Sequence, residues 1–157
     1  MKVQRMTPTQ IGAVSEHMVA AQLMLASGGR LSPYLPIADD DGIDLMLHDK
    51  VTKRTMPIQV KSRTGLDKAA GGTVQFDVRR STFSEGGYLL AVLFGKGGAE
   101  IERAWLIPMV ELPSVANARA DKYAITPSPK DTSEDRYTAY RCCDLAEVSE
   151  RLMGPGR

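Results

Sequence analysis

The chain has 157 residues, of which 43% are hydrophobic, and its formal net charge is +1. This length and apolar content suit one domain with a single core, which we place at residues 1–157. No apolar run is long enough to span a bilayer, and the N-terminus MKVQRMTPTQ lacks the layout of a signal peptide, so we expect a cytoplasmic protein. The adjacent Cys142 and Cys143 exclude a disulfide between distant segments and paired metal-ligand spacing.

Charge is distributed unevenly along the sequence. Residues 1–49 contain three Lys or Arg against six Asp or Glu, whereas residues 50–80 contain eight basic against two acidic residues. An acidic segment followed by a basic one would suit a site that holds cations and a phosphate backbone together. The same distribution also fits a solvated surface, so charge alone does not decide between them.

The first expected element is a helix that ends at the glycine pair 28–29. Thr7 and Gln10 have the spacing of a capping box, and Pro8 occupies the first helical position. Apolar residues then recur every three or four positions. This broad apolar face predicts a largely buried helix.

Extended segments follow the helix. Residues 31–37 (LSPYLPI) form a proline-interrupted extended piece, and the residues of GIDLMLH (42–48) and PIQVKSR (57–63) alternate as strands do. We expect these two strands to pair antiparallel, because only the charged turn DKVTKRT separates them.

The rest of the chain predicts a mixed sheet and a closing helix. The expected elements after residue 64 are a short strand at 73–78, an apolar strand at 88–94 covered on both faces, its hairpin neighbour at 101–108, an extended piece at 136–142 and a helix at 144–153. Asp144 and Glu147 fit a capping pair for that last helix. This order of elements predicts a mixed α/β fold.

Polar residues interrupt the two strands at 42–48 and 57–63. Because side chains alternate along a strand, Asp44 should face away from the apolar side of its strand, as Gln59 and Lys61 should on theirs. If the two apolar sides lie together, these three polar residues gather on the opposite face. A carboxylate with a neutral carbonyl suits Mg²⁺, and a nearby lysine can orient or deprotonate a water molecule and offset phosphate charge.

Glu16 is a further acidic candidate on the first helix. Its neighbours three and four positions away are Ala13, Val19 and Ala20, which are small or apolar. A carboxylate in such surroundings needs a partner, which a metal ion or Lys61 would supply. A loop cap or an ion pair with an arginine would supply one equally well.

A glutamate on the opening helix, GID on one strand and QVK on the next together resemble the PD-(D/E)xK nuclease superfamily, in its Holliday-junction-resolvase-like and methylation-directed restriction-endonuclease-like branches. The resemblance implies a restriction-endonuclease-like α/β core, with an N-terminal helix and flanking helices around a mixed β-sheet. It also implies an Mg²⁺- or Mn²⁺-dependent endonuclease that hydrolyses DNA phosphodiester bonds. Asp44, Gln59 and the backbone carbonyl of Val60 would hold the metal, Glu16 would be the helix acid, and Lys61 would manage the attacking water. Gln59 departs from the Asp or Glu of the family name, which removes one ligand charge.

Four basic residues are the expected phosphate contacts that would position DNA: Arg63, Lys68, Arg79 and Arg80. Cutting both strands of a duplex uses two active sites, which is consistent with a homodimer. The alternative function is a catalytically inactive nucleic-acid-binding module of the same fold. An interaction subunit with a merely structural polar cluster is a third reading, but it leaves Gln59 and Lys61 unexplained.

Two neighbouring polar residues are weaker candidates. Asp41 could be an outer metal ligand, but a turn-forming role before Gly42 is the simpler interpretation. His48 shares the strand face of Asp44, but it has no second histidine or cysteine at metal-ligand spacing.

Overall fold

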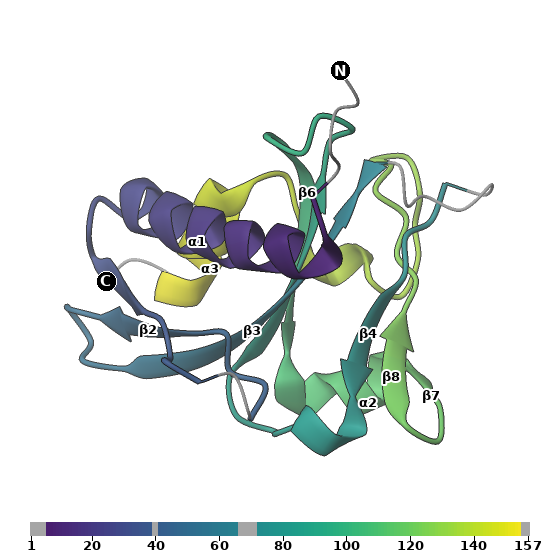
Figure 1. The fold of residues 1–157 in the computed structure, drawn as a ribbon, viewed down its shortest axis with the longest axis horizontal. Helices are drawn as coiled ribbons and strands as arrows, with labels where there is room; N and C mark the ends of the chain where they lie inside the picture. The colour runs from purple at the N-terminus through teal and green to yellow at the C-terminus, as the bar shows by residue number, and fades with distance from the viewer. Residues whose placement is uncertain (1–5, 39–40, 66–71, 155–157) are drawn as a thin grey trace.

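The computed structural model of the chain describes residues 6–38, 41–65 and 72–154. Helices cover one face of a six-stranded sheet, and a three-stranded sheet covers the other (Figure 1). The helices and strands are α1 (Pro8–Ala26), β1 (Leu31–Tyr34), β2 (Leu45–Asp49), β3 (Thr55–Thr64), β4 (Phe76–Arg79), β5 (Tyr88–Phe94), β6 (Ile101–Pro108), α2 (Leu112–Val115), β7 (Asn117–Ala118), β8 (Lys122–Ile125), β9 (Arg141–Cys142) and α3 (Leu145–Met153). One-turn 3-10 helices lie at η2 (Arg80–Thr82), η3 (Met109–Glu111) and η4 (Thr138–Tyr140).

The six-stranded sheet is mixed, as the sequence predicts. Its strand order is β1-β2-β3-β5-β6-β9. Strands β3 and β5 are parallel, and every other neighbouring pair in this sheet is antiparallel. The expected hairpin of β2 and β3 is confirmed, and so is the hairpin of β5 and β6.

Helix α1 begins with the predicted capping box. The backbone N–H of Gln10 donates to Thr7 Oγ1 at 3.2 Å, and the N–H of Thr7 donates to Gln10 Oε1 at 2.8 Å. The prediction of a largely buried helix is wrong in extent, because Val14, Met24 and Leu25 are exposed and the helix packs on the sheet through one stripe only. The buried stripe consists of Ser15, Val19, Ala20 and Leu23. No helix in the described part of the chain is long and apolar enough to cross a membrane.

Two hydrophobic cores lie on the two faces of the six-stranded sheet. The first core joins that sheet to α1 and α3, and the second joins it to the three-stranded sheet and α2. Strand β5 contributes to both: Leu90, Val92 and Phe94 lie in the first core, and Leu89, Ala91 and Leu93 lie in the second. This double burial explains why residues 88–94 are apolar without interruption.

The three-stranded sheet, with strand order β4-β8-β7, was not expected beyond the strand at 73–78. Strand β8 has four residues and β7 has two, so neither contains an alternation long enough to predict a strand. The sheet forms because Phe76, Val78 and Ile125 can bury their side chains against β5 and β6.

A partly buried ion pair stabilises the β1–β2 edge of the large sheet. The Arg30 guanidinium donates to both oxygens of Asp49, at 2.9 Å and 2.8 Å, and Asp49 is 2% exposed. Asp49 also accepts the N–H of Val51 at 2.9 Å and the hydroxyl of Thr52 at 2.8 Å. These interactions, led by the Arg30 hydrogen bond, hold the pKa of Asp49 well below its usual range.

Candidate active site

The β2–β3 hairpin opens at the point where the predicted site residues lie. The last residue pair of its register is Leu45 with Ile58, and the N–H of Asp44 still donates to the Ile58 carbonyl at 3.0 Å. Leu45 and Ile58 both lie in the first core. The expected alternation of side chains therefore holds. Strand β2 begins at Leu45, later than the predicted residue 42, because its register with β3 begins at Leu45.

The side chain of Asp44 hydrogen-bonds to the backbone of β3. Its Oδ2 accepts the N–H of Val60 at 2.6 Å, and the residue is 7% exposed. A backbone N–H of a strand lies in the plane of the sheet, so the carboxylate occupies the place that a carbonyl of β2 would take if the strand continued. Asp44 is therefore fixed at the edge of β3 beyond its pairing with β2, between the two faces of the sheet.

The carbonyl of Val60 points toward the same edge, because the N–H and C=O of one strand residue lie on the same side of the strand. No residue of β2 lies opposite Val60, because the pairing of β2 with β3 extends only as far as Ile58. A carboxylate and a backbone carbonyl therefore lie together where the pairing of β2 with β3 has ended.

Gln59 is a buried amide whose oxygen has no partner. The residue is 4% exposed, and its Oε1 has no hydrogen-bond partner within the described residues. In the register it lies opposite Leu89, so its side chain is on the face of the second core. Leaving a buried amide group unpaired costs about 1–3 kcal/mol, which favours a site that a ligand completes.

A small cavity of about 20 Å³ borders Gln59. Its polar lining includes Asp41, Thr82 and Ser84. This is room for one water-sized occupant. Asp41 accepts the N–H of Ile43 at 3.2 Å, which supports the turn-forming role expected for it and also brings it beside the cavity.

Lys61 and Arg63 continue a polar row along the same face of β3. They lie opposite Ala91 and Leu93 in the register, and both are half-buried. Arg63 also acts on β4, across the second core. Although burial acts to raise the pKa of Asp77, hydrogen bonds from Lys122 and Gln75 and the charges of Lys122 and Arg63 together lower it.

Glu16 lies on α1, which packs on the other face of the sheet. It lies half-buried on α1, one turn before Val19 and Ala20, which pack in the first core with Val60. The helix that carries Glu16 therefore lies on the opposite face of the sheet from Gln59 and Lys61. Asp44 lies in the plane of the sheet, with the α1 face on one side and the row of Gln59 and Lys61 on the other.

The remaining predicted residues lie apart from this edge. Arg79 ends β4 and is exposed. Arg80 is exposed in η2, yet its Nε donates to the Arg119 carbonyl at 2.7 Å and its guanidinium lies 4.5 Å from the centre of the Tyr123 ring. Lys68 lies outside the described residues. The sequence does not indicate Arg119 or Tyr123, because residues 117–125 contain no motif and no alternation long enough to predict a strand.

A metal ion at this edge would need neutral oxygens as well as carboxylates. Among residues 6–38, 41–65 and 72–154, no group of three or more His, Cys, Asp and Glu side chains is arranged to hold a metal ion. The predicted set contains only two carboxylates, those of Asp44 and Glu16. The orphaned Gln59 oxygen and the Val60 carbonyl are hard oxygen donors of the kind that Mg²⁺ accepts beside one or two carboxylates.

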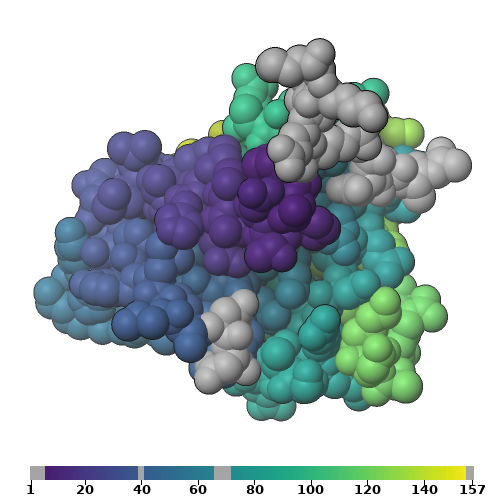
Figure 2. Space-filling model, in the orientation of Figure 1, coloured from purple at the N-terminus to yellow at the C-terminus, as the bar shows by residue number. Residues whose placement is uncertain are grey.

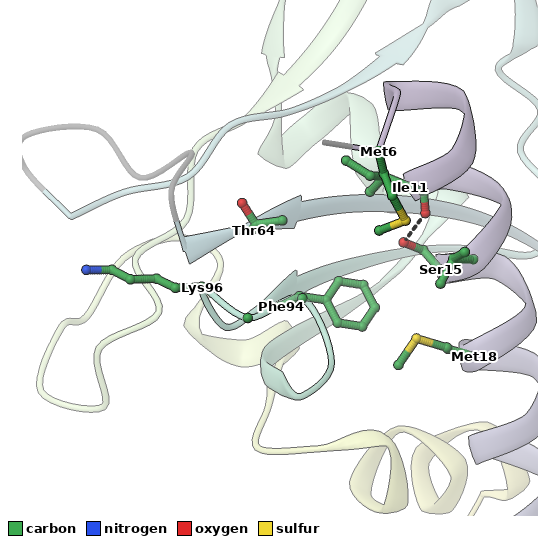
Figure 3. Close-up of a pocket in the computed structure, with 10 residues that line it drawn as sticks. Met6, Ile11, Ser15, Met18, Thr64, Phe94 and Lys96 are labelled. Atoms are coloured by element: carbon green, nitrogen blue, oxygen red, sulfur yellow. Dashed lines mark hydrogen bonds between the residues drawn. The ribbon is translucent and has the colours of Figure 1, made fainter. Parts of the chain in front are cut away.

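Another cavity, of about 260 Å³, lies between α1 and the ends of β3 and β5 (Figure 3). Met6, Ile11, Met18 and Phe94 give it an apolar lining, while the side chain of Lys96 extends away from the helix. Its Ser15 hydroxyl already donates to the carbonyl of residue 11 at 2.7 Å. This cavity lacks the convergent polar groups that a metal site requires.

Neither a protein-family model nor a curated protein matches the sequence. Solved structures align with the chain over most of its length. A bacterial homing endonuclease aligns with a TM-score of 0.61 at 18% identity, covering 87% of this chain and 88% of its own. A Holliday junction resolvase from Archaeoglobus fulgidus aligns with a TM-score of 0.49 at 11% identity, covering 85% of this chain and 99% of its own. The first comparison confirms the predicted restriction-endonuclease-like mixed α/β fold.

Proposed function

We propose, starting from this restriction-endonuclease-like fold, that the protein is a divalent-metal-dependent endonuclease that hydrolyses phosphodiester bonds of DNA. The observation that carries the proposal is the Gln59 side chain, which is buried although its oxygen has no partner among the described residues. A buried glutamine with a structural role would have a hydrogen-bond partner within the protein, whereas the oxygen of a metal ligand has its partner only when the cation is bound.

The oxygen donors of the β2–β3 edge would hold Mg²⁺ or Mn²⁺. They are Asp44, the carbonyl of Val60 and the amide oxygen of Gln59, with Glu16 on the helix side. The hydrogen bond from the Val60 N–H fixes the Asp44 carboxylate, and an ionised carboxylate keeps further lone pairs for a cation. A divalent cation there would activate a water molecule and neutralise charge on the phosphate.

Lys61 would position the attacking water. It follows Gln59 by two residues on the same face of β3, so its ammonium group can approach the scissile phosphate from the side of the amide. A lysine there can orient or deprotonate a water molecule at Nζ and offset the negative charge that develops on the phosphate.

Metal binding tests the donor set. Titration calorimetry with Mg²⁺ and with Mn²⁺ should detect binding to the wild-type protein and none to Asp44→Asn. Gln59→Glu should keep or tighten binding because it restores a ligand charge, and Lys61→Ala should retain it because an ammonium group is not a ligand. Lys50→Ala, on the exposed β2–β3 turn, is the control and should bind as the wild type does.

Cleavage tests the chemistry. The assay is nicking and cutting of supercoiled plasmid and of a branched DNA in Mg²⁺ and in Mn²⁺, with folding checked by circular dichroism. Lys61→Ala and Lys61→Arg should both lose cleavage, because a guanidinium is planar, larger and too basic to exchange a proton near neutral pH. Asp44→Asn should lose metal binding and cleavage together.

Two outcomes would overturn parts of the proposal. If the wild type cuts neither substrate and Gln59→Glu does not restore cutting, the nuclease function falls and a catalytically inactive nucleic-acid-binding module of the same fold replaces it. If Lys61→Ala cuts as well as the wild type, the role given to Lys61 is wrong although the metal site can stand.

A further inference from the structure

Three arginines from two distant segments meet at one end of the three-stranded sheet. Arg79 and Arg80 end β4 and begin η2, and Arg119 lies in the turn between β7 and β8. Strand β4 pairs with β8 so that Arg79 lies opposite Lys122. Figure 2 shows the β7–β8 hairpin, in light green, at the lower right of the molecule beside the teal surface that contains β4 and η2.

Arg80 joins the two segments. Its backbone N–H donates to the Asp121 carbonyl at 2.9 Å, its Nε donates to the Arg119 carbonyl at 2.7 Å, and its guanidinium stacks on Tyr123. Tyr123 also packs against Phe83, with ring centres 5.1 Å apart. The predicted phosphate contact Arg80 is therefore engaged within the protein, and its contacts fix the position of the turn that carries Arg119.

The side chains of Arg79 and Arg119 make no comparable contacts within the described residues. Both are exposed, and neither side chain has a hydrogen bond, ion pair or ring contact within the described part of the chain. Lys122, by contrast, pairs with Asp77 at 3.0 Å. The two segments that Arg80 joins therefore each carry an unpaired guanidinium group, and guanidinium groups bind phosphate oxygens in bidentate geometry.

The 3-10 helix η2, which begins with Arg80, packs against the loop that precedes Asp44. Gly42, two residues before Asp44, packs so closely on η2 that a Cβ atom there would lie 2.7 Å from the Thr82 Cβ and 2.8 Å from the Thr82 carbonyl oxygen. The cavity beside Gln59 includes Thr82 in its lining. In Figure 1 the end of β4 and the β7–β8 turn lie on the same lower side of the molecule.

We infer that the β7–β8 hairpin is the second half of a DNA phosphate-backbone surface, in which Arg79 and Arg119 bind phosphates on a strand that leads into the site. This inference rests on the proposed nuclease function and extends it to a segment that the sequence did not indicate. Such contacts position DNA without reading its sequence.

The test is binding of an arbitrary-sequence duplex labelled with fluorescein, measured by anisotropy in EDTA over a series of salt concentrations. One phosphate contact contributes about 0.9 to the slope of log affinity against log salt, which corresponds to about eightfold in affinity at 0.1 M salt relative to 1 M. Arg79→Ala and Arg119→Ala should each reduce the slope by about 0.9 and weaken binding by about that factor at 0.1 M. Arg119→Lys, which keeps the charge, should recover most of the loss.

Arg54→Ala is the matched control, because Arg54 is an exposed arginine on the β2–β3 turn, at the far side of the sheet from the β7–β8 hairpin. Its affinity and slope should stay close to those of the wild type. Affinity and slope unchanged in Arg119→Ala would overturn the inference, and so would an equal loss in Arg54→Ala, which would indicate only a general charge effect. Because binding is measured in EDTA, a metal-dependent cleavage that persists in Arg119→Ala with unchanged binding would refute this surface while leaving the nuclease proposal standing.

Discussion

Replacing Gln59 by methionine should stabilise the metal-free protein. The amide is 4% exposed and its oxygen has no partner within the described residues, so folding removes it from water without compensation. Leaving such a group unsatisfied costs about 1–3 kcal/mol. Methionine has a similar length and a flexible apolar side chain, so it should fill the same space and raise the free energy of unfolding by about that amount.

The gain should reverse in the presence of metal. At a metal concentration one hundred times its dissociation constant, binding to the native state adds about 2.7 kcal/mol to the stability of the wild type. Gln59→Met removes one ligand, so its stability should depend less on Mg²⁺ or Mn²⁺. The measurement is urea unfolding followed by circular dichroism, in EDTA and in saturating Mn²⁺.

Gln75→Met is the control, because Gln75 is an exposed glutamine whose Nε2 donates to Asp77 Oδ1 at 2.9 Å. It should not stabilise the metal-free protein, and its response to metal should equal that of the wild type. If Gln59→Met instead lowers the unfolding free energy in EDTA by more than about 1 kcal/mol, the amide has a structural role and the reasoning fails. An undiminished response to Mn²⁺ in Gln59→Met would remove Gln59 from the ligand set.

Three further predictions concern the scaffold. Asp49→Ala should lower the unfolding free energy by about 1–3 kcal/mol, because it removes a partly buried ion pair and a buried hydrogen-bond acceptor; since the pKa of Asp49 is depressed, this difference should be full above the ordinary value of 3.8 and shrink as pH falls below it in urea titrations. Gly87→Ala should cost about 3–5 kcal/mol, because at φ +77° its Cβ would lie 2.0 Å from the Pro57 carbonyl oxygen, whereas Gly86→Ala, with no neighbour closer than 3.9 Å, should be nearly neutral by the same unfolding assay. Burial raises the pKa of Cys142 to about 11, so a thiol reagent at pH 8 should label the native chain once, at the exposed neighbouring cysteine, and twice after unfolding; two rapid labels in the native state would contradict this burial.

The unpaired amide oxygen also suggests a physical reason for Gln59 at a position where the motif that the sequence resembles has an acid. A second buried carboxylate beside Asp44 would be expensive to ionise without a cation, whereas a neutral amide costs less. Gln59→Glu should therefore make folding more dependent on metal than it is in the wild type, and unfolding in EDTA compared with Mn²⁺ would measure that dependence. Equal stability of the two proteins in EDTA would show that the extra charge finds a partner within the chain.

The sequence alone predicted those helices and strands whose stabilising contacts join residues close together in the chain. The capping box of Thr7 and Gln10 sets the start of α1, and alternation sets the faces of β2 and β3, because both effects act within a few residues. The unbroken apolar run at 88–94 similarly indicated a strand buried on both faces. The resemblance carried by Glu16, GID and QVK on a helix, a strand and a strand also indicated the restriction-endonuclease-like fold.

Tertiary structure decided what depends on distant partners. The sequence placed Asp44 on a strand face, but the opening of the hairpin lets its carboxylate bond to the Val60 N–H in the plane of the sheet. Strands β7 and β8 form because β4 pairs with β8 over the second core. Strands of two and four residues are too short for their sequence alternation to predict them. Arg119 joins Arg79 and Arg80 for the same reason: pairing between strands brings together residues that are about forty positions apart, and the energy of that contact is not encoded in either segment alone.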